Sequence, residues 1–88
     1  RNRRMSYGLE ILRAAQKQLA QITPIDQGRI VAAIKDLADA PRPAGCKKLS
    51  GRPGWRIRIG SYRVIYEIHD DKLLILVVTV GHRREIYR

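Results

Sequence analysis

Two short segments with alternating apolar and polar residues constrain the fold of this chain most strongly. They span residues 55–59 and 62–66, and a Gly-Ser pair separates them. A glycine-containing pair between two alternating runs is typical of a tight β-hairpin. In a two-residue loop, Arg58 lies directly opposite Arg63. The sequence therefore predicts an antiparallel hairpin with a defined register.

This predicted hairpin has one face that carries arginines. Successive side chains of a strand alternate between faces, so Arg56, Arg58 and Arg63 project from the same side. The other side carries apolar and aromatic residues, namely Trp55, Ile57, Ile59, Tyr62, Val64 and Tyr66. Like charges that face each other destabilise a hairpin. The cluster therefore indicates an anionic ligand, and RNA is the polyphosphate that we expect there.

The positive overall charge indicates that the binding partner is negatively charged. The chain has 88 residues, 44% of them apolar, and a formal net charge of +10 at pH 7. This size and apolar content predict a single globular domain over residues 1–88. Residues 1–4 precede Met5, and we take them as non-native or disordered, without weight in the fold. The charge predicts that the partner is a nucleic acid, an acidic protein or an anionic surface.

Several classes of protein are disfavoured. The longest apolar run, residues 73–80, is too short to span a bilayer, and there is no signal-peptide pattern. We therefore expect a cytoplasmic protein with no membrane partner. Cys46 is the single cysteine of the chain, which excludes an internal disulfide and a thiolate framework for zinc. The sequence predicts a loop thiol at Cys46, and neither a metal nor a cofactor.

The first half of the chain is expected to be mainly helical. A short strand is predicted near residues 5–10, and apolar residues at helical spacing then predict a helix over residues 12–22. A second helix is expected from Pro24 onwards, with Thr23 as its N-cap, and Pro41 ends it. The short connection predicts that the two helices form an antiparallel hairpin.

The second half is expected to be mainly β. Prolines and glycines predict a loop over residues 41–53, and three strands follow, the last two joined at residues 70–71. The predicted fold class is therefore α+β. The predicted architecture is a mainly antiparallel four-stranded sheet with the N-terminal helix hairpin packed on one face.

The last predicted strand, residues 73–80, is apolar on both faces, as an internal strand would be. If the turn at residues 70–71 keeps a two-residue register, Leu74, Leu76 and Val78 lie on the arginine side of the sheet. A bulge at the turn would change this parity. The chain has little spare length to cover these side chains, so we expect a partner protein to do so.

Several motifs together resemble a known family. They are Lys47-Lys48-Leu49-x-Gly51, the hairpin described above, and the ending Gly-His-Arg-Arg-Glu-Ile-Tyr of residues 81–87. From Tyr7 onward the chain resembles the RelE branch of the RelE/ParE toxin superfamily. The resemblance implies a RelE-like toxin of a type II toxin–antitoxin pair with a cognate acidic antitoxin. It also implies a ribosome-dependent mRNA endoribonuclease that contacts mRNA and rRNA in the ribosomal A site.

The resemblance also implies roles for particular residues. The catalytic positions that it implies are Arg63, Arg83 and Tyr87. The substrate-binding positions that it implies are Arg56 and Arg58. From the residues themselves we also expect substrate binding at Lys47, Lys48, His82 and Arg84. Members of the family often have lysines where this chain has Arg56 and Arg58. Since arginine stays charged, it binds phosphate well and is a poor general base.

The chemistry of RNA cleavage fits such a residue set. RNA carries its own nucleophile, the ribose 2′-hydroxyl, so cleavage needs positioning, a proton acceptor and cations, but no metal. Arginines can stabilise the phosphorane, and Tyr87 can transfer a proton, stack on a base or simply pack. The general base stays open, with His82 as another candidate. Two other functions also stay open: a ParE-type gyrase poison and a non-catalytic RNA-binding module.

Overall fold

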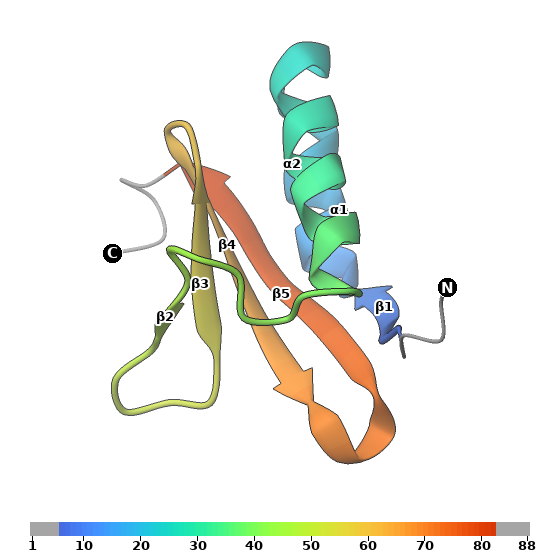
Figure 1. Cartoon of the computed structure of the whole chain (residues 1–88). Coiled ribbons are helices and arrows are strands. Elements are labelled where there is room, and N and C mark those ends of the chain that lie inside the picture. Colours follow the sequence, from blue (N-terminus) through green and yellow to red (C-terminus); the bar gives the residue numbers. More distant parts are fainter. Residues whose placement is uncertain (1–5, 83–88) are drawn as a thin grey trace.

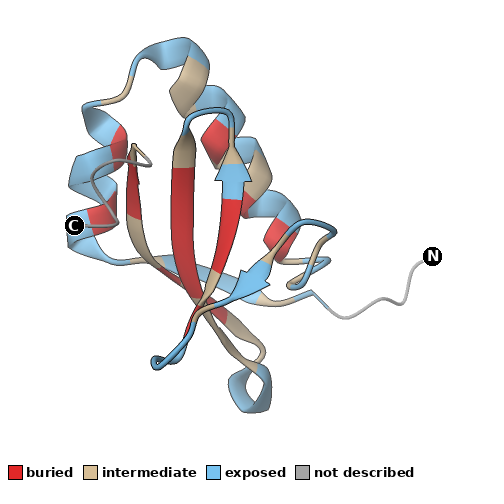
Figure 2. Cartoon of the chain, turned by 90° about the vertical axis from the view of Figure 1, so that its left-hand side faces the viewer, coloured by how far each residue is buried: buried red, intermediate tan, exposed pale blue. Residues whose placement is uncertain are grey.

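The computed structural model describes residues 6–82 and consists of two layers (Figure 1). A helix pair covers one face of a five-stranded sheet, and Figure 2 views the sheet from its other face. The elements in chain order are β1 (Gly8–Ile11), α1 (Arg13–Ala20), α2 (Pro24–Leu37), β2 (Lys47–Lys48), β3 (Trp55–Ile59), β4 (Tyr62–His69), a 3₁₀ turn (Asp70–Lys72) and β5 (Leu74–His82). The predicted α+β class is confirmed.

The sheet has the strand order β1-β5-β4-β3-β2. β1 runs parallel to β5, and the remaining neighbours are antiparallel. Within residues 6–82 the sheet has one strand more than predicted, because β2 lies in a segment that was expected to be a loop. Two residues are too few to show an alternating pattern. They form a strand because they pair with the edge of β3.

Both helices lie close to their predicted positions, and one capping contact differs. Thr23 precedes α2 and Pro24 is its first residue, as expected. The Thr23 side chain makes no capping bond to the helix backbone. Its hydroxyl instead lies 3.4 Å from Oδ2 of Asp26. Neither helix in the described part of the chain is long and apolar enough to cross a membrane.

The hydrophobic core lies between the helix pair and the sheet. The helices contribute the buried residues Ala15, Leu19, Ile30, Ile34 and Leu37, and the sheet contributes Ile57, Val64, Tyr66, Ile75, Val77 and Val80. Trp55 and Tyr62 pack against this cluster. The apolar face of the predicted hairpin therefore packs into the core.

The connection between β4 and β5 differs from the predicted two-residue turn. His69 pairs with Leu74, so four residues form the loop. Leu73 occupies the left-handed region at φ 51°, which ends the 3₁₀ turn. Two additional loop residues leave the parity of β5 unchanged, so the loop length does not alter the predicted face of β5.

An irregularity further along β5 replaces the bulge that was considered at the turn. Ile65 pairs with Thr79 and Tyr66 pairs with Val77, so the register skips Val78. Before this bulge, the pairing of Leu76 with Glu67 and of Leu74 with His69 places both leucines on the face opposite the helices. The predicted placement of these two side chains is confirmed. Val78 is the unpaired residue of the bulge, between Val77 and Thr79.

Candidate nucleic-acid interface

The hairpin of β3 and β4 determines where the arginines lie. Arg58 pairs with Arg63, and Arg56 pairs with Ile65, as the two-residue turn predicts. Gly60 in this turn has φ +60°, a value that glycine adopts without steric cost. Arg56, Arg58 and Arg63 therefore share the sheet face that points away from the helices. We refer to this face as the arginine face.

The three arginines differ in exposure. Arg58 is exposed, whereas Arg56 is 7% exposed and Arg63 is 5% exposed. Ile65 lies on the same face and is also buried. An exposed guanidinium can meet an approaching phosphate first, while a buried one acts in a medium of lower dielectric constant, where attraction to an anion is stronger. The face thus combines an accessible cation with two buried ones.

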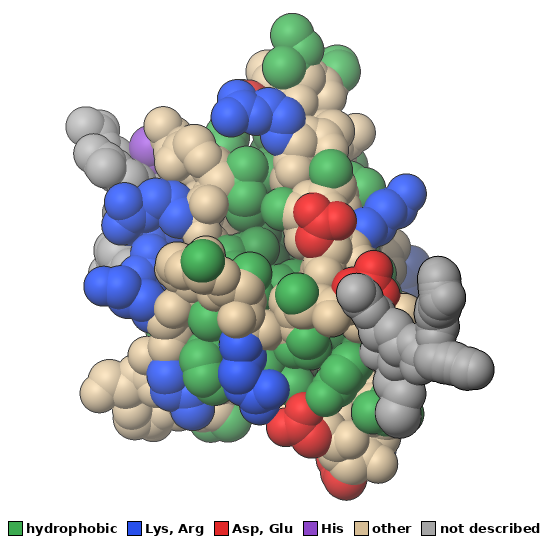
Figure 3. All heavy atoms as spheres, in the orientation of Figure 1, with side chains coloured by type: hydrophobic (Ala, Val, Ile, Leu, Met, Phe, Trp, Pro, Cys, Tyr) green, Lys and Arg blue, Asp and Glu red, His purple; other side chains and the backbone are tan. Residues whose placement is uncertain are grey.

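The two lysines of β2 point to opposite sides of the sheet. Lys47 pairs with Arg56 and therefore shares the arginine face. Lys48 pairs with Trp55, and its Nζ lies 6.0 Å from the Trp55 ring centroid. The guanidinium of Arg42 lies over the same ring at 5.2 Å. Lys and Arg side chains gather over β2 and β3 at the left-hand side of the molecule (Figure 3).

His82 also lies away from the arginine face. It pairs with Tyr62, and the two rings meet edge to face with centroids 5.7 Å apart and planes at 78°. Gly81, the preceding residue, pairs with Arg63. Of the predicted site residues, the structure brings together Lys47, Arg56, Arg58 and Arg63, and it separates Lys48 and His82 from them. Arg83, Arg84 and Tyr87 lie outside the described residues.

One acidic side chain borders the arginine face. Glu67 follows Ile65 on the same side of β4, and its Oε1 lies 2.9 Å from Nε2 of His69. Its partner is therefore a histidine on its own strand.

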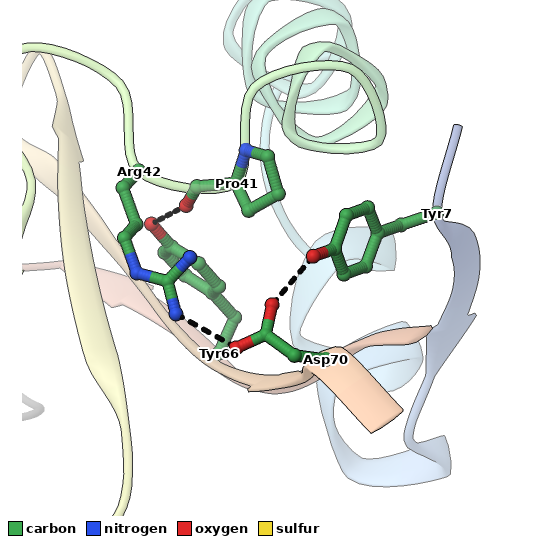
Figure 4. A network of polar contacts seen from close by, with 5 residues as sticks. All are labelled: Tyr7, Pro41, Arg42, Tyr66 and Asp70. Atoms are coloured by element: carbon green, nitrogen blue, oxygen red, sulfur yellow. Dashed lines mark hydrogen bonds and ion pairs between the residues drawn. The ribbon is translucent and has the colours of Figure 1, made fainter. Parts of the chain in front are cut away.

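A polar network that the sequence did not predict joins three loops on the helix side (Figure 4). The Tyr7 hydroxyl and the Arg42 guanidinium both donate to Asp70, the latter at 3.0 Å. The Tyr7 hydrogen bond, followed by Arg42, lowers the pKa of the Asp70 carboxyl. Tyr66 donates to the carbonyl of Pro41 at 2.8 Å, and burial raises the pKa of Tyr66. Because these residues lie far apart in the sequence, no local pattern could reveal their contacts.

Two pockets flank Tyr62 at the end of the sheet where β4 begins. The larger, of about 280 Å³, lies between the end of α1 and the end of β5. The smaller, of about 190 Å³, lies between the start of α2 and the β3–β4 turn. Within residues 6–82, no three side chains of the metal-binding types (His, Cys, Asp and Glu) form a group that could hold a metal ion.

The sequence matches a known family of toxins. A family model described as the ParE toxin of the type II toxin–antitoxin system parDE matches residues 9–87. The toxin RelG of Mycobacterium tuberculosis is 30% identical over 92 residues, which cover 96% of this chain and 99% of RelG. The mRNA interferase toxin RelE of Escherichia coli is 26% identical over 88 residues, covering 94% of this chain and 92% of that protein.

Solved structures agree with these relatives. The archaeal RelE–RelB complex from Pyrococcus horikoshii contains a chain that superposes with a TM-score of 0.81 and 25% identity, covering 92% of this chain and 99% of that one. The fold and the matches define a toxin of the type II toxin–antitoxin class, in the RelE/ParE superfamily. Within that superfamily, the chain belongs to the RelE branch.

Proposed function

We propose that this toxin is a ribosome-dependent endoribonuclease that cuts mRNA in the ribosomal A site. The observation that carries the proposal is the gathering of Arg56, Arg58 and Arg63 on one face of the sheet. Arginines in direct opposition cost stability, so an anionic ligand between them explains their presence. The similarity to proteins named mRNA interferases supports RNA as that ligand.

In this proposal, exposed cations bind the RNA and the buried Arg63 stabilises the transition state. Arg58, which is exposed, contacts the backbone phosphate as the RNA docks, with Lys47 beside it. Arg63 stabilises the negative charge that develops on the phosphorane, together with Arg83. The 2′-hydroxyl of the RNA attacks the adjacent phosphate, and the bond from phosphorus to the 5′ oxygen of the next nucleotide breaks. The 2′-hydroxyl loses a proton and the leaving 5′ oxygen gains one, and Tyr87 transfers a proton in this exchange. The other predicted contacts within the described residues, Lys48 and His82, bind RNA outside this centre. Arg84 is a further predicted RNA contact.

Substitution of single residues tests the proposal. Cells express Arg63→Ala, Arg83→Ala or Tyr87→Phe, and primer extension on translated mRNA measures cleavage. Loss of a charge-stabilising donor costs about 10²–10³ in rate, and loss of acid–base catalysis costs about 10²–10⁴. We expect mRNA cleavage and toxicity to disappear in all three variants.

Arg29→Ala is the matched control, because Arg29 is exposed on α2, in the other layer of the molecule. It removes the same charge and should leave cleavage intact. Cleavage that persists in the Arg63, Arg83 and Tyr87 variants would exclude the assigned roles.

Poisoning of DNA gyrase is the second candidate, because the matching family model is named for ParE toxins. Such a toxin acts through a protein–protein surface and needs no catalytic geometry. It would retain its toxicity after loss of Arg63 or Tyr87. Plasmid supercoiling, measured in the same cells as mRNA cleavage, separates the candidates: a supercoiling defect with intact mRNA indicates the gyrase poison.

An acidic antitoxin is the proposed protein partner. The solved relatives include a RelE–RelB complex, and this chain combines a charge of +10 with partly exposed apolar side chains at Leu74, Leu76 and Val78. A partner that folds over these side chains would bury apolar surface and neutralise charge together. Co-expression with the neighbouring reading frame, followed by affinity capture, should recover a small acidic protein. Recovery of this chain alone, with harmless expression, would contradict the pairing.

A further inference from the structure

The larger pocket beside Tyr62 has walls suited to a neutral, planar ligand. Gln18, Gln21 and Ile22 line it from the helix side, and Tyr62 and His82 line it from the sheet. Among the described residues, no Lys, Arg, Asp or Glu lines it. The described walls therefore offer no cation to a phosphate, whereas amides and aromatic rings are the groups that hydrogen-bond and stack nucleobases.

The size and position of this pocket fit one base of a longer strand. Its volume of about 280 Å³ is at the lower limit of small-molecule sites, which suits a single base. Neighbouring residues of a strand lie on opposite faces of the sheet. Arg63 and its partner Gly81 therefore lie on the arginine face, and Tyr62 and its partner His82 lie on the pocket side. The arginine face and the pocket therefore meet at the same end of the sheet.

One wall of the pocket is held in place by the backbone. The Val80 N–H donates to Oε1 of Gln18 at 2.8 Å, which holds this amide oxygen toward β5. The NH₂ group and a second lone pair of Oε1 remain for a ligand. β1 ends opposite Val77, so no residue of β1 pairs with Val80. The Gln18 side chain supplies the acceptor that a neighbouring strand would otherwise provide. Gln21 is exposed and supplies a second amide with both donor and acceptor.

We propose that this pocket binds one unpaired base of the RNA substrate and so determines a nucleotide preference close to the cleavage site. The inference rests on the proposed function, because the base belongs to the RNA that lies on the arginine face. The strand passes around the end of β4 and β5, with a phosphate on the arginines and a neighbouring base between the glutamines and the two rings.

Nucleoside titration tests the pocket without requiring cleavage. Adenosine, guanosine, cytidine and uridine are added in turn to the purified chain, and NMR follows the side-chain amides of Gln18 and Gln21. We expect one nucleoside to shift both amides more than the others do. The same base should be enriched at a fixed position beside the mRNA cleavage sites in cells.

Gln21→Ala provides the matched variant, since Gln21 is exposed and its loss leaves the core intact. Because a bidentate amide contact to a base is worth about five- to 150-fold, we expect at least about a fivefold loss of affinity for the preferred nucleoside. The base enrichment beside the cleavage sites should disappear as well. Gln16→Ala makes the same change in α1 outside the pocket and should alter neither measurement.

The outcomes separate the pocket from the proposed function. If no nucleoside shifts the amides, or if Gln21→Ala binds as the unsubstituted chain does, the pocket assignment is overturned. If the nucleoside binds and Gln21→Ala weakens it while mRNA stays intact in cells, base binding stands and the ribonuclease proposal fails.

Discussion

Arg58 and Arg63 lie directly opposite each other across the β3–β4 hairpin. The Arg58 side chain is exposed, whereas Arg63 is buried, with 5% of its surface accessible. Residues in this relation have neighbouring Cβ atoms, so their charges repel. In the proposed complex, a phosphate between them relieves this repulsion. The proposed function places the RNA phosphate at this pair of arginines.

Replacing Arg58 with Thr should stabilise the chain and impair its function. The change removes the repulsion and introduces a β-branched residue into an exposed strand position, so we expect a gain of about 0.2–1 kcal/mol in the free energy of unfolding. Urea unfolding measures the gain, and primer extension should show weaker cleavage. Arg52→Thr, which removes the same charge from an exposed loop, should leave stability within about 0.5 kcal/mol. A loss of stability in Arg58→Thr would contradict this account.

Gln18→Ala should destabilise the end of β5. The variant leaves the N–H of Val80, a fully buried residue, without the acceptor it has at 2.8 Å. An unsatisfied buried donor costs about 1–3 kcal/mol. Amide hydrogen exchange should become faster at Val80, and urea unfolding should show the lower stability. Gln16→Ala removes an exposed amide contact to the Ile11 carbonyl and should cost less; equal losses would argue against a special role for Gln18.

Asp70→Asn should change the response of the chain to acid. The Tyr7 hydrogen bond and Arg42 lower the pKa of Asp70 in the folded state. A lowered pKa stabilises the fold at pH values above about 4, the ordinary pKa of aspartate, and this contribution is lost as pH falls through the folded-state pKa. Urea midpoints between about pH 6 and 2 should therefore fall less steeply in Asp70→Asn than in the unsubstituted chain. Asp71→Asn makes the same change at the adjacent residue and should retain the steep fall.

Tyr66→Phe should lower stability at neutral pH and change the alkaline response. The Tyr66 hydroxyl donates to the Pro41 carbonyl, and loss of such a bond costs about 0.5–1.5 kcal/mol. Burial raises the pKa of Tyr66, so its protonated form stabilises the fold below about pH 10, and this contribution is lost as pH rises further. Unfolding followed from pH 8 to 11 should show a smaller alkaline loss in Tyr66→Phe; equal losses would show that another group titrates.

Local sequence patterns were sufficient for the hairpin and for much of the core. The alternation in residues 55–59 and 62–66 fixed both the register and the faces, because a strand has a period of two and a two-residue turn allows one pairing. Three of the predicted site residues, Arg56, Arg58 and Arg63, could be placed together for the same reason.

Other parts of the site depended on contacts between distant segments. Lys47 and Lys48 lie on opposite faces because β2 pairs with β3. A two-residue strand is too short for a sequence pattern to predict this pairing. The length of the β4–β5 loop and the bulge at Val78 follow from how β5 fits between β1 and β4. The burial of Arg63 likewise depends on the packing around it, and not on its position in the strand pattern.

The sequence by itself determined the α+β class, the helix pair, the hairpin register and the arginine face. These features have periods of two or 3.6 residues, so the order of apolar and polar residues is enough to specify them. Only the tertiary structure decided the fifth strand, the Tyr7–Asp70–Arg42 network and the pocket between Gln18 and His82. Each of these joins segments that lie far apart in the chain, and their contacts exist only after the sheet and helices have packed.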